Sequence, residues 1–456
     1  MVINNVSGFV KDYVSDLSFQ LALHEPSYRL STIQAKWISF CLTCLLLSNE
    51  FNWSCYSRLG FNYYKISALS WMFRHSKINF DVLFRRSIAH ILSTYGLECG
   101  HIVFDDTDNQ RSKNAVHIHG LGKQKDKKSG GYFLGQSIVF MLLVTDKVTI
   151  PVGFLFYEND PTWLTWKKED TLLVSKKVAK AHRPNEIPRN FDGYPTKYAL
   201  CTQLLTHFKQ HFPSFRVVSI MADCFYGTKE WTADMSVLYP KTQIISQLKS
   251  NQKIIYQNTE YSVTTYFKQR AAISSTTVIR GGKTVPIYYS SVIAKVKAHD
   301  TKRLIIAYKY HGETEFRYVF ATDMSWMPHH IMATYSLRWL VEVFIADWKT
   351  YEGWAVLTKH IGYEGSNTTL NLSLLFDHCL MLHPEQQARI KNNLPPATVG
   401  SLREKCIQQH LVKTIEYIIN APNPKELLIQ LVNNIDKIYV LRDSKKHLSE
   451  KKFALT

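Results

Sequence analysis

Four side chains that could act on phosphate recur at helical spacing between residues 335 and 349. At about 100° per residue, Tyr335, Arg338 and Lys349 lie within roughly 40° of Glu342 around a helix axis. A carboxylate flanked by fixed cations suits metal-assisted chemistry on phosphate, because the acid holds the ion and the cations hold the anionic substrate. The alternative is a solvent-exposed helix on which Arg338 and Glu342 form an i, i+4 ion pair. This segment alone favours neither interpretation.

Two further acidic sites follow apolar runs that are typical of strands. Asp105 and Asp106 follow Ile-Val-Phe, and Asp223 follows Ser-Ile-Met-Ala. In α/β proteins functional groups gather at the C-terminal ends of strands, and hard divalent ions prefer the oxygen ligands that several carboxylates provide. An Asp after a strand is by itself more often a turn former or a helix cap. Together with the polar stripe at 335–349, these acids predict one metal-dependent site.

The elements that must position these acids change in type along the chain. Residues 14–95 carry large apolar side chains at three- and four-residue spacing, which predicts helices, and residues 57–76 are a candidate helix-turn-helix. From residue 101 short apolar runs predict strands, followed by a helix at 196–211 and a strand at 215–222. This order is that of an RNase H-like α/β domain, although many other α/β folds share parts of it.

The remaining sequence predicts a β-rich insertion and a helical end. Hairpin signals stand at Arg-Gly-Gly-Lys (280–283) and His-Gly-Glu-Thr (311–314). We therefore expect the α/β class, with an RNase H-like mixed sheet core, a β-rich insertion and helical N- and C-terminal regions. The expected parts are a helical N-terminal region (1–95), the first part of the core (96–250), the insertion (251–325), the final core helix (326–370) and a helical C-terminal region (371–456). For residues 1–95, binding of DNA ends and a plain helical bundle with a solvated basic face are equally open.

Charge and composition narrow the choice of partner. The 456 residues include 55 Lys and Arg against 37 Asp and Glu, a net charge of +18, which predicts an acidic partner. Nucleic acid is the first candidate and an anionic membrane surface the second. The apolar run at 37–47 is far shorter than the ~20 residues of a spanning helix, and we expect a cytoplasmic protein without a membrane segment. Cys41 and Cys44 have no companion ligands, so they are expected in the core.

The three acidic motifs resemble those of DDE transposases of bacterial insertion sequences. Tyr335, Arg338, Glu342 and Lys349 match the spacing of the Tyr-Arg-Glu-Lys signature that defines one group of these enzymes. The strand-end Asp-Asp-Thr (105–107) is similar to the first acidic motif of the family, and Ala-Asp-Cys-Phe-Tyr-Gly (222–227) to the second. The resemblance covers roughly residues 95–375 and implies an RNase H-like core.

Family resemblance also implies roles for individual residues. Asp106, Asp223 and Glu342 would bind two Mg²⁺ ions, with Mn²⁺ as a substitute, for in-line attack on phosphorus. The acid directly before Thr selects Asp106, while Asp105 remains an alternative. Arg338, Lys349 and the hydroxyl of Tyr335 would contact DNA phosphates; the Tyr335 ring could equally be a packing residue.

The resemblance predicts a cut-and-paste enzyme that acts on double-stranded DNA at the inverted terminal repeats of its element. It also predicts a homodimer, because two DNA ends must be held together. Two alternatives remain: a catalytically inactive DNA-binding descendant, and an RNase H-like nuclease that does not join strands. Tyr318 and Trp326 are candidates for stacking a flipped base, but core packing is the favoured interpretation for both.

A lysine-rich loop at 123–132 resembles a phosphate-binding loop only in composition. It lacks the Gly-Lys-Ser/Thr ending of a P-loop, so we do not expect nucleotide binding. Its lysines, Lys125, Lys127 and Lys128, are expected near the DNA backbone, with a solvated hairpin turn as the alternative of equal weight. A second basic run lies between residues 167 and 183, and it either follows phosphates or is a solvated face.

Overall fold

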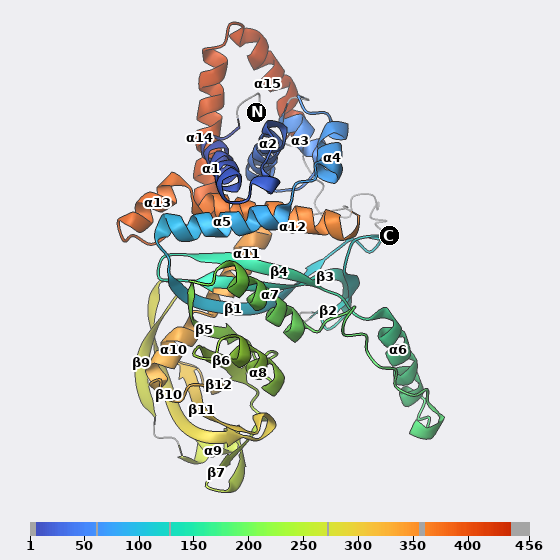
Figure 1. Ribbon diagram of the computed structural model, residues 1–456, viewed down its shortest axis with the longest axis vertical. Helices are drawn as coiled ribbons and strands as arrows, with labels where there is room; N and C mark the ends of the chain where they lie inside the picture. The colour runs from blue at the N-terminus through green and yellow to red at the C-terminus, as the bar shows by residue number, and fades with distance from the viewer. Residues whose placement is uncertain (1–5, 61–62, 127–128, 271–272, 355–360, 439–456) are drawn as a thin grey trace, which may run out of the picture.

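A mixed sheet runs the length of the protein in the computed structural model (Figure 1), which describes residues 6–60, 63–126, 129–270, 273–354 and 361–438. The strands are β1 (Cys99–Gln110), β2 (Leu121–Lys125), β3 (Tyr132–Val144), β4 (Thr149–Tyr157), β5 (Arg216–Ala222), β6 (Gln243–Leu248), β7 (Lys253–Tyr256), β8 (Thr259–Ser262), β9 (Ser274–Arg280), β10 (Lys283–Val296), β11 (Thr301–Tyr310) and β12 (Arg317–Ala321). All of them join one twelve-stranded sheet.

Helices cover both faces of this sheet. They are α1 (Gly8–His24), α2 (Thr32–Ser48), α3 (Trp53–Leu59), α4 (Ile66–His75), α5 (Phe80–Tyr95), α6 (Pro161–Ser175), α7 (Lys197–His211), α8 (Lys229–Leu238), α9 (Val263–Arg270), α10 (Pro328–Ser336), α11 (Trp339–Tyr351), α12 (Gly362–Met381), α13 (Pro384–Lys391), α14 (Val399–Ile419) and α15 (Pro424–Ile438). The N-terminal and C-terminal helices gather on one side of the sheet (Figure 1), so the two ends of the sequence form one helical layer.

The centre of the sheet has the strand arrangement of an RNase H-like core. β1 pairs antiparallel with β3 and parallel with β5, and β5 pairs parallel with β6. Parallel pairing brings the C-terminal ends of β1 and β5 to the same edge. The predicted α/β class with a mixed, RNase H-like sheet is confirmed.

The predicted β-rich insertion continues this same sheet beyond β6. β12 pairs antiparallel with β6, and β11, β10, β7 and β8 follow in order. The β9–β10 hairpin turns at Gly281 and Gly282, which have φ of +57° and +71°. Two successive left-handed residues are the geometry of a tight hairpin turn, and glycine adopts it without steric cost. The insertion therefore shares its backbone ladder with the core.

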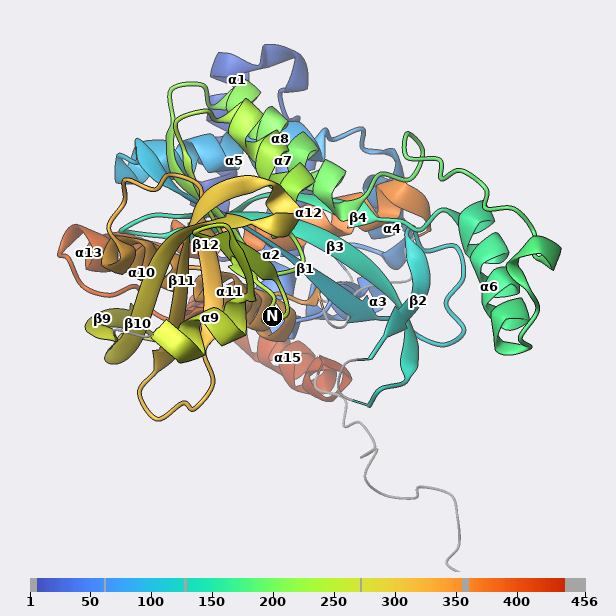
Figure 2. The ribbon, with the colours of Figure 1, turned by 90° about the horizontal axis from the view of Figure 1, so that it is seen from below.

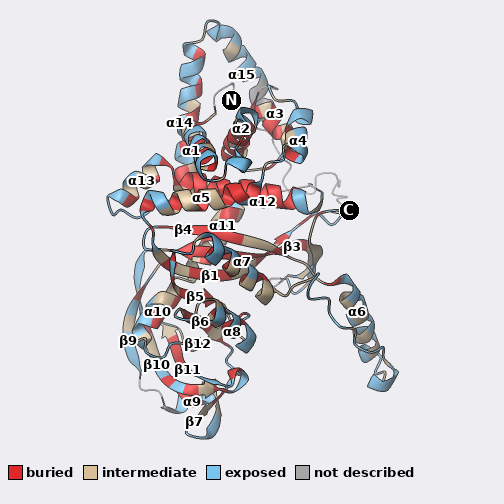
Figure 3. Cartoon of the chain, viewed as in Figure 1, coloured by how far each residue is buried: buried red, intermediate tan, exposed pale blue. Residues whose placement is uncertain are grey.

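The main hydrophobic core fills the space between the sheet and the helical layer (Figure 3) and continues to α7 and α8 on the other face of the sheet. Every residue of β3 from Gly135 to Val144 is buried, as is every residue of α12 from Gly365 to Leu380. A helix that is buried on all sides belongs to the centre of a protein rather than to its surface. Thus α12, beside α5, joins the helical layer to the sheet.

The α6 region is the opposite case. No residue from Pro161 to Ala199 is buried, and α6 projects away from the body of the protein (Figures 1 and 2).

Two general expectations can be compared with the structure. Within the described residues, no helix has the length and hydropathy needed to cross a membrane. All eight cysteines are free thiols, and Cys41 and Cys44 are buried in α2 as expected for core residues.

Candidate active site

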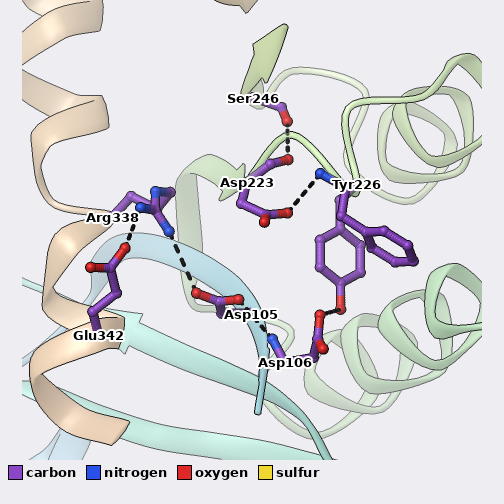
Figure 4. Close-up of polar contacts among 8 residues, drawn as sticks. Asp105, Asp106, Asp223, Tyr226, Ser246, Arg338 and Glu342 are labelled. Atoms are coloured by element: carbon purple, nitrogen blue, oxygen red, sulfur yellow. Dashed lines mark hydrogen bonds and ion pairs between the residues drawn. The ribbon is translucent and has the colours of Figure 1, made fainter. Parts of the chain in front are cut away.

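Asp105 and Asp106 lie in β1, and their side chains point to opposite faces of the sheet (Figure 4). Alternation is the rule for successive residues in a strand. Asp105 faces Arg338, whose Nη1 lies 3.4 Å from Asp105 Oδ2. Asp106 instead forms an ion pair with Lys197 and accepts a hydrogen bond of 3.3 Å from the hydroxyl of Tyr226. Only one of the two acids can therefore face the residues of α11.

Arg338 joins Asp105 to the acid of the predicted stripe. It stands at the N-cap of α11, and its Nη2 lies 2.5 Å from Glu342 Oε1, so that the guanidinium bridges the two carboxylates (Figure 4). Arg338 is largely buried, whereas the side chain of Glu342 is 47% exposed. The i, i+4 ion pair considered from the sequence does form, but it borders the end of β1 rather than open solvent.

Asp223 completes this group from the loop after β5. Its backbone is fixed because its carbonyl oxygen accepts a hydrogen bond from Ser246 Oγ at 2.7 Å, and its Oδ1 accepts the backbone N–H of Phe225 at 2.8 Å. Burial and the neighbouring carboxylate of Asp223 raise the pKa of Asp105 to about 7, against the opposing effect of Arg338. We call Asp105, Asp223 and Glu342, with Arg338 among them, the acid cluster.

The helix that carries Arg338 and Glu342 is held on the sheet by aromatic packing. Phe344 and Trp348 contact the ring of Phe140 in β3, with centroids 5.7 and 4.9 Å apart. The spacing of four residues puts both rings on one face of α11. On a neighbouring face Lys349 Nζ donates to Thr107 Oγ1 at 2.6 Å and to the carbonyl of Asp108 at 2.8 Å. Lys349 thus ties α11 to β1 beside the acid cluster.

The prediction of one continuous helix from Tyr335 to Lys349 is wrong. α10 ends at Ser336 and α11 begins at Trp339, with i to i+3 hydrogen bonds across Leu337 and Arg338. Such bonds tighten the turn and change the helix phase. Tyr335 nevertheless lines the same pocket as Arg338 and Glu342, from the last turn of α10.

Tyr335 lies in the core with 5% of its surface exposed. Its hydroxyl has no hydrogen-bond partner among the described residues, and burial raises its pKa well above the ordinary value. Packing was the alternative role open for this ring, and the position of the side chain agrees with it.

Sequence reasoning missed the polar cluster on the other face of β1. Lys197 is the first residue of α7, and it is 91 positions from Asp106. Tyr226 is wholly buried, three residues after Asp223. Its place within Ala-Asp-Cys-Phe-Tyr-Gly could have drawn attention to it, whereas nothing near Lys197 in the sequence points to the acids. We call Asp106, Lys197 and Tyr226 the paired cluster.

A pocket of about 240 Å³ opens beside Arg338 and Glu342. Its walls combine cations and aromatic rings: Arg280, Tyr308, Tyr310, Arg317 and Trp339. The guanidinium of Arg280 lies 5.1 Å from the Tyr310 ring centroid and 5.3 Å from that of Trp339. Arginine and aromatic faces can hold phosphates and planar bases. Arg280 and Trp339 could not be paired from the sequence, because they are 59 positions apart. The β9–β10 hairpin brings Arg280 to the start of α11, where Trp339 lies.

The other predicted site residues, the lysines of the 123–132 loop and the two candidate stacking residues, lie outside the acid cluster. Lys125 is exposed at the end of β2, and Lys127 and Lys128 fall outside the described residues. Tyr318 is 4% exposed and packs on Phe267, with ring centroids 5.9 Å apart. Trp326 is half-buried against the main core. Both positions agree with packing and neither presents a free ring.

The donors of the acid cluster are all oxygens, which suits hard divalent cations. Among the described residues no three His, Cys, Asp or Glu side chains converge closely enough to hold a metal ion. In this arrangement the guanidinium of Arg338 pairs with both Asp105 and Glu342. Burial is the largest cause of the raised pKa of Asp105, and the nearby carboxylate of Asp223 adds to it. In their chemistry, the three carboxylates of the acid cluster therefore fit a hard divalent ion.

Fold and site together define an α/β protein of the RNase H-like class, with acids from two adjacent parallel strands and one helix. Within this class, residues 192–361 match the family model described as Transposase DDE domain, so the chain carries such a domain and the resemblance to DDE transposases is confirmed. The matched segment includes Asp223, Arg338, Glu342 and Lys349, while Asp105 precedes it. Comparison with curated proteins found no match. The narrower group with the Tyr-Arg-Glu-Lys signature stays a prediction.

Proposed function

We propose that this transposase cuts and joins DNA at the terminal inverted repeats of an insertion sequence by metal-assisted phosphoryl transfer. The observation that carries the proposal is the acid cluster, in which Asp105 and Glu342 pair with Arg338 and Asp223 lies near enough to Asp105 to raise its pKa. A homodimer belongs to the proposal, since cut ends must be held together to be joined.

Asp105, rather than Asp106, is proposed as the first acid. Asp106 is neutralised by Lys197 and turned to the other face of β1, so it cannot reach the ion that Asp223 and Glu342 would share. Two Mg²⁺ or Mn²⁺ ions held by Asp105, Asp223 and Glu342 would supply Lewis-acid polarisation of the phosphate and a lowered pKa for bound water. We propose that Asp106 positions the site instead, because it links β1 to the loop that carries Asp223.

Arg338 is proposed to bind the scissile phosphate. Its planar fork matches phosphate as well as it matches carboxylate, so the guanidinium can exchange Glu342 for a DNA phosphate. That exchange would free Glu342, which is already half-exposed, to serve as a ligand. Asp105 can hold a proton on its carboxylate near neutral pH until a cation replaces it. Lys349 keeps α11 against β1 throughout, and Lys125 is proposed to contact DNA at the tip of the hairpin.

A cleavage assay tests this function. Purified protein would be incubated with labelled duplex that carries the DNA flanking its own gene, with Mg²⁺, Mn²⁺, Ca²⁺ or EDTA. We expect strand cleavage at the repeat ends with Mg²⁺ or Mn²⁺, and joining of the released 3′ ends to a supercoiled plasmid. Cleavage without joining would instead identify a nuclease, and binding without any cleavage would identify an inactive DNA-binding protein. A Glu342→Gln variant is the control for contaminating nucleases.

A further inference from the structure

A projecting arm separates β4 from α7. It comprises α6 and the returning segment, residues 161–189, and neither part contains a buried residue. Figure 2 shows α6 well apart from the sheet and from the helical layer. A segment of this length that buries nothing contributes little to the core, so its shape must serve a different purpose from stability.

Asp160 closes the arm at its base. Its Oδ1 accepts the backbone N–H groups of Thr162 and Trp163 at 2.9 and 3.1 Å and so caps α6, while its Oδ2 accepts the N–H of Asn190 at 3.0 Å. The bond from Asn190 is the main cause of a lowered pKa for Asp160. Both ends of the arm thus meet at one side chain, and the arm is a unit that can be removed without separating β4 from α7.

Polar and cation–π contacts hold the two halves of the arm together. The guanidinium of Arg189 lies 3.6 Å from the ring centroid of Trp163, Arg183 pairs with Asp170 at 2.8 Å, and Trp166 Nε1 donates to the carbonyl of Pro184 at 3.3 Å. These contacts join the start and the middle of α6 to the returning segment. The arm therefore keeps a defined form although it lacks a core.

The arm is basic, and most strongly so at its tip. Against Glu169, Asp170 and Glu186 it carries seven cations: Lys167, Lys168, Lys176, Lys177, Lys180, Arg183 and Arg189. Lys176, Lys177 and Lys180 at the distal end of α6 form no salt bridge within the described residues. With 15 residues, α6 is about 22 Å long, which is comparable to the width of a DNA duplex.

We propose that this arm binds the sugar–phosphate backbone of duplex DNA at a second location, away from the acid cluster. The inference rests on the proposed function and assigns it an additional DNA contact. Charge complementarity selects DNA over a second copy of the chain, because two arms of the same net charge repel each other. Backbone contacts carry no sequence information, so the arm adds affinity and orientation for flanking DNA rather than recognition of the repeat.

The test is the salt dependence of binding to a labelled random-sequence duplex of about 40 base pairs in EDTA, where cleavage cannot occur. Each lost phosphate contact lowers the slope of log K against log salt by about 0.9, so Lys176→Gln, Lys177→Gln and Lys180→Gln together should lower it by up to about 3. Replacing residues 161–189 with a short Gly-Ser linker should lower it at least as much, with an unchanged melting temperature.

Matched neutralisations of Lys391, Lys413 and Lys425, which are exposed on the C-terminal helices, control for the loss of three charges. An equal change of slope in this control, or no change in the arm variants, would overturn the proposal. Dissociation of a dimer by the arm deletion in sedimentation would also overturn it, in favour of a second copy as partner. If the arm variants keep the wild-type slope while wild type still cleaves repeat ends, only the arm proposal fails; wild type that cleaves nothing refutes the proposed function.

Discussion

The two faces of β1 treat adjacent carboxylates in opposite ways. Asp106 has a lysine and a buried tyrosine hydroxyl of its own, whereas Asp105 shares a single guanidinium with Glu342 and lies near Asp223. A carboxylate with dedicated partners stabilises the fold and is unavailable to a ligand. A carboxylate that competes for positive charge is ready to bind a cation. On this basis we propose a positioning role for Asp106 and a catalytic one for its neighbour Asp105.

The largest expected effect separates the two aspartates directly. Asp105→Asn should lower strand cleavage by about 1000-fold or more, since ion-mediated stabilisation of the transition state contributes several kcal/mol. Glu342→Gln and Asp223→Asn should act similarly, while DNA binding in Ca²⁺ stays near the wild-type level. Single-turnover cleavage rates of the four variants, including Asp106→Asn, provide the measurement. Full activity of the Asp105→Asn variant would contradict the proposed role of Asp105 and would favour Asp106 as the catalytic acid.

A smaller effect is expected on the paired cluster. Asp106→Asn should lower the cleavage rate by about 10- to 100-fold, as is usual when a residue that orients a metal ligand is changed. Lys197→Met should be equally harmful, and the double variant should be no worse than either single one, because both remove the same ion pair. Rates at several Mg²⁺ concentrations would show whether metal affinity changes. Independent, multiplied losses in the double variant would contradict a shared positioning role.

A further expected effect concerns stability and pH in metal-free buffer. The pKa of Asp105 in the folded protein is about 7, above its ordinary value near 3.8, so the folded state binds the proton more tightly than the unfolded state. Stability should therefore fall as pH rises from about 4 to 7, by no more than about 4 kcal/mol, since each pKa unit corresponds to 1.36 kcal/mol. Melting temperatures of wild type and Asp105→Asn across this range provide the measurement.

Asp105→Asn should show a weaker decline over the same interval, because its amide does not ionise. Buried Asp377 also has a raised pKa near 7, and it contributes equally to both proteins, so the difference between the two curves isolates Asp105. Parallel curves for wild type and Asp105→Asn would show that the pKa of Asp105 is not raised in the folded protein.

Local sequence patterns predicted the parts of the site that depend on the conformational preferences of neighbouring residues. The apolar run before Asp105, the Asp after β5 and the Gly-Gly hairpin all follow from strand and turn preferences. The helix break at Leu337 did not, because the segment 335–349 contains neither Pro nor Gly. The break accompanies a contact between Arg338 and Asp105, which are 233 positions apart. Such pairing is decided by tertiary structure and leaves no mark on the local pattern.

Tertiary structure also decides which of Asp105 and Asp106 faces α11. A strand presents two faces, and only the pairing of β1 with β3 and β5 decides which of them meets α11. The alignment of the acid before Thr favoured Asp106, while the geometry places Asp105 in the acid cluster. Lys197 could not be found at all without the fold, because its only relation to the acids is spatial.

Continuity of the sheet from β1 to β10 has a mechanical consequence. Ser246 in β6 holds the backbone of Asp223 and pairs with Phe320 in β12, which is joined through β11 to the hairpin that carries Arg280. An unbroken ladder of backbone hydrogen bonds therefore connects Asp223, which would receive an ion, to Arg280 at the pocket wall. This ladder resists changes in the distance between the two residues. DNA bound at the hairpin would be held at a fixed distance from the carboxylates. A change in this distance would require several backbone hydrogen bonds of the sheet to break.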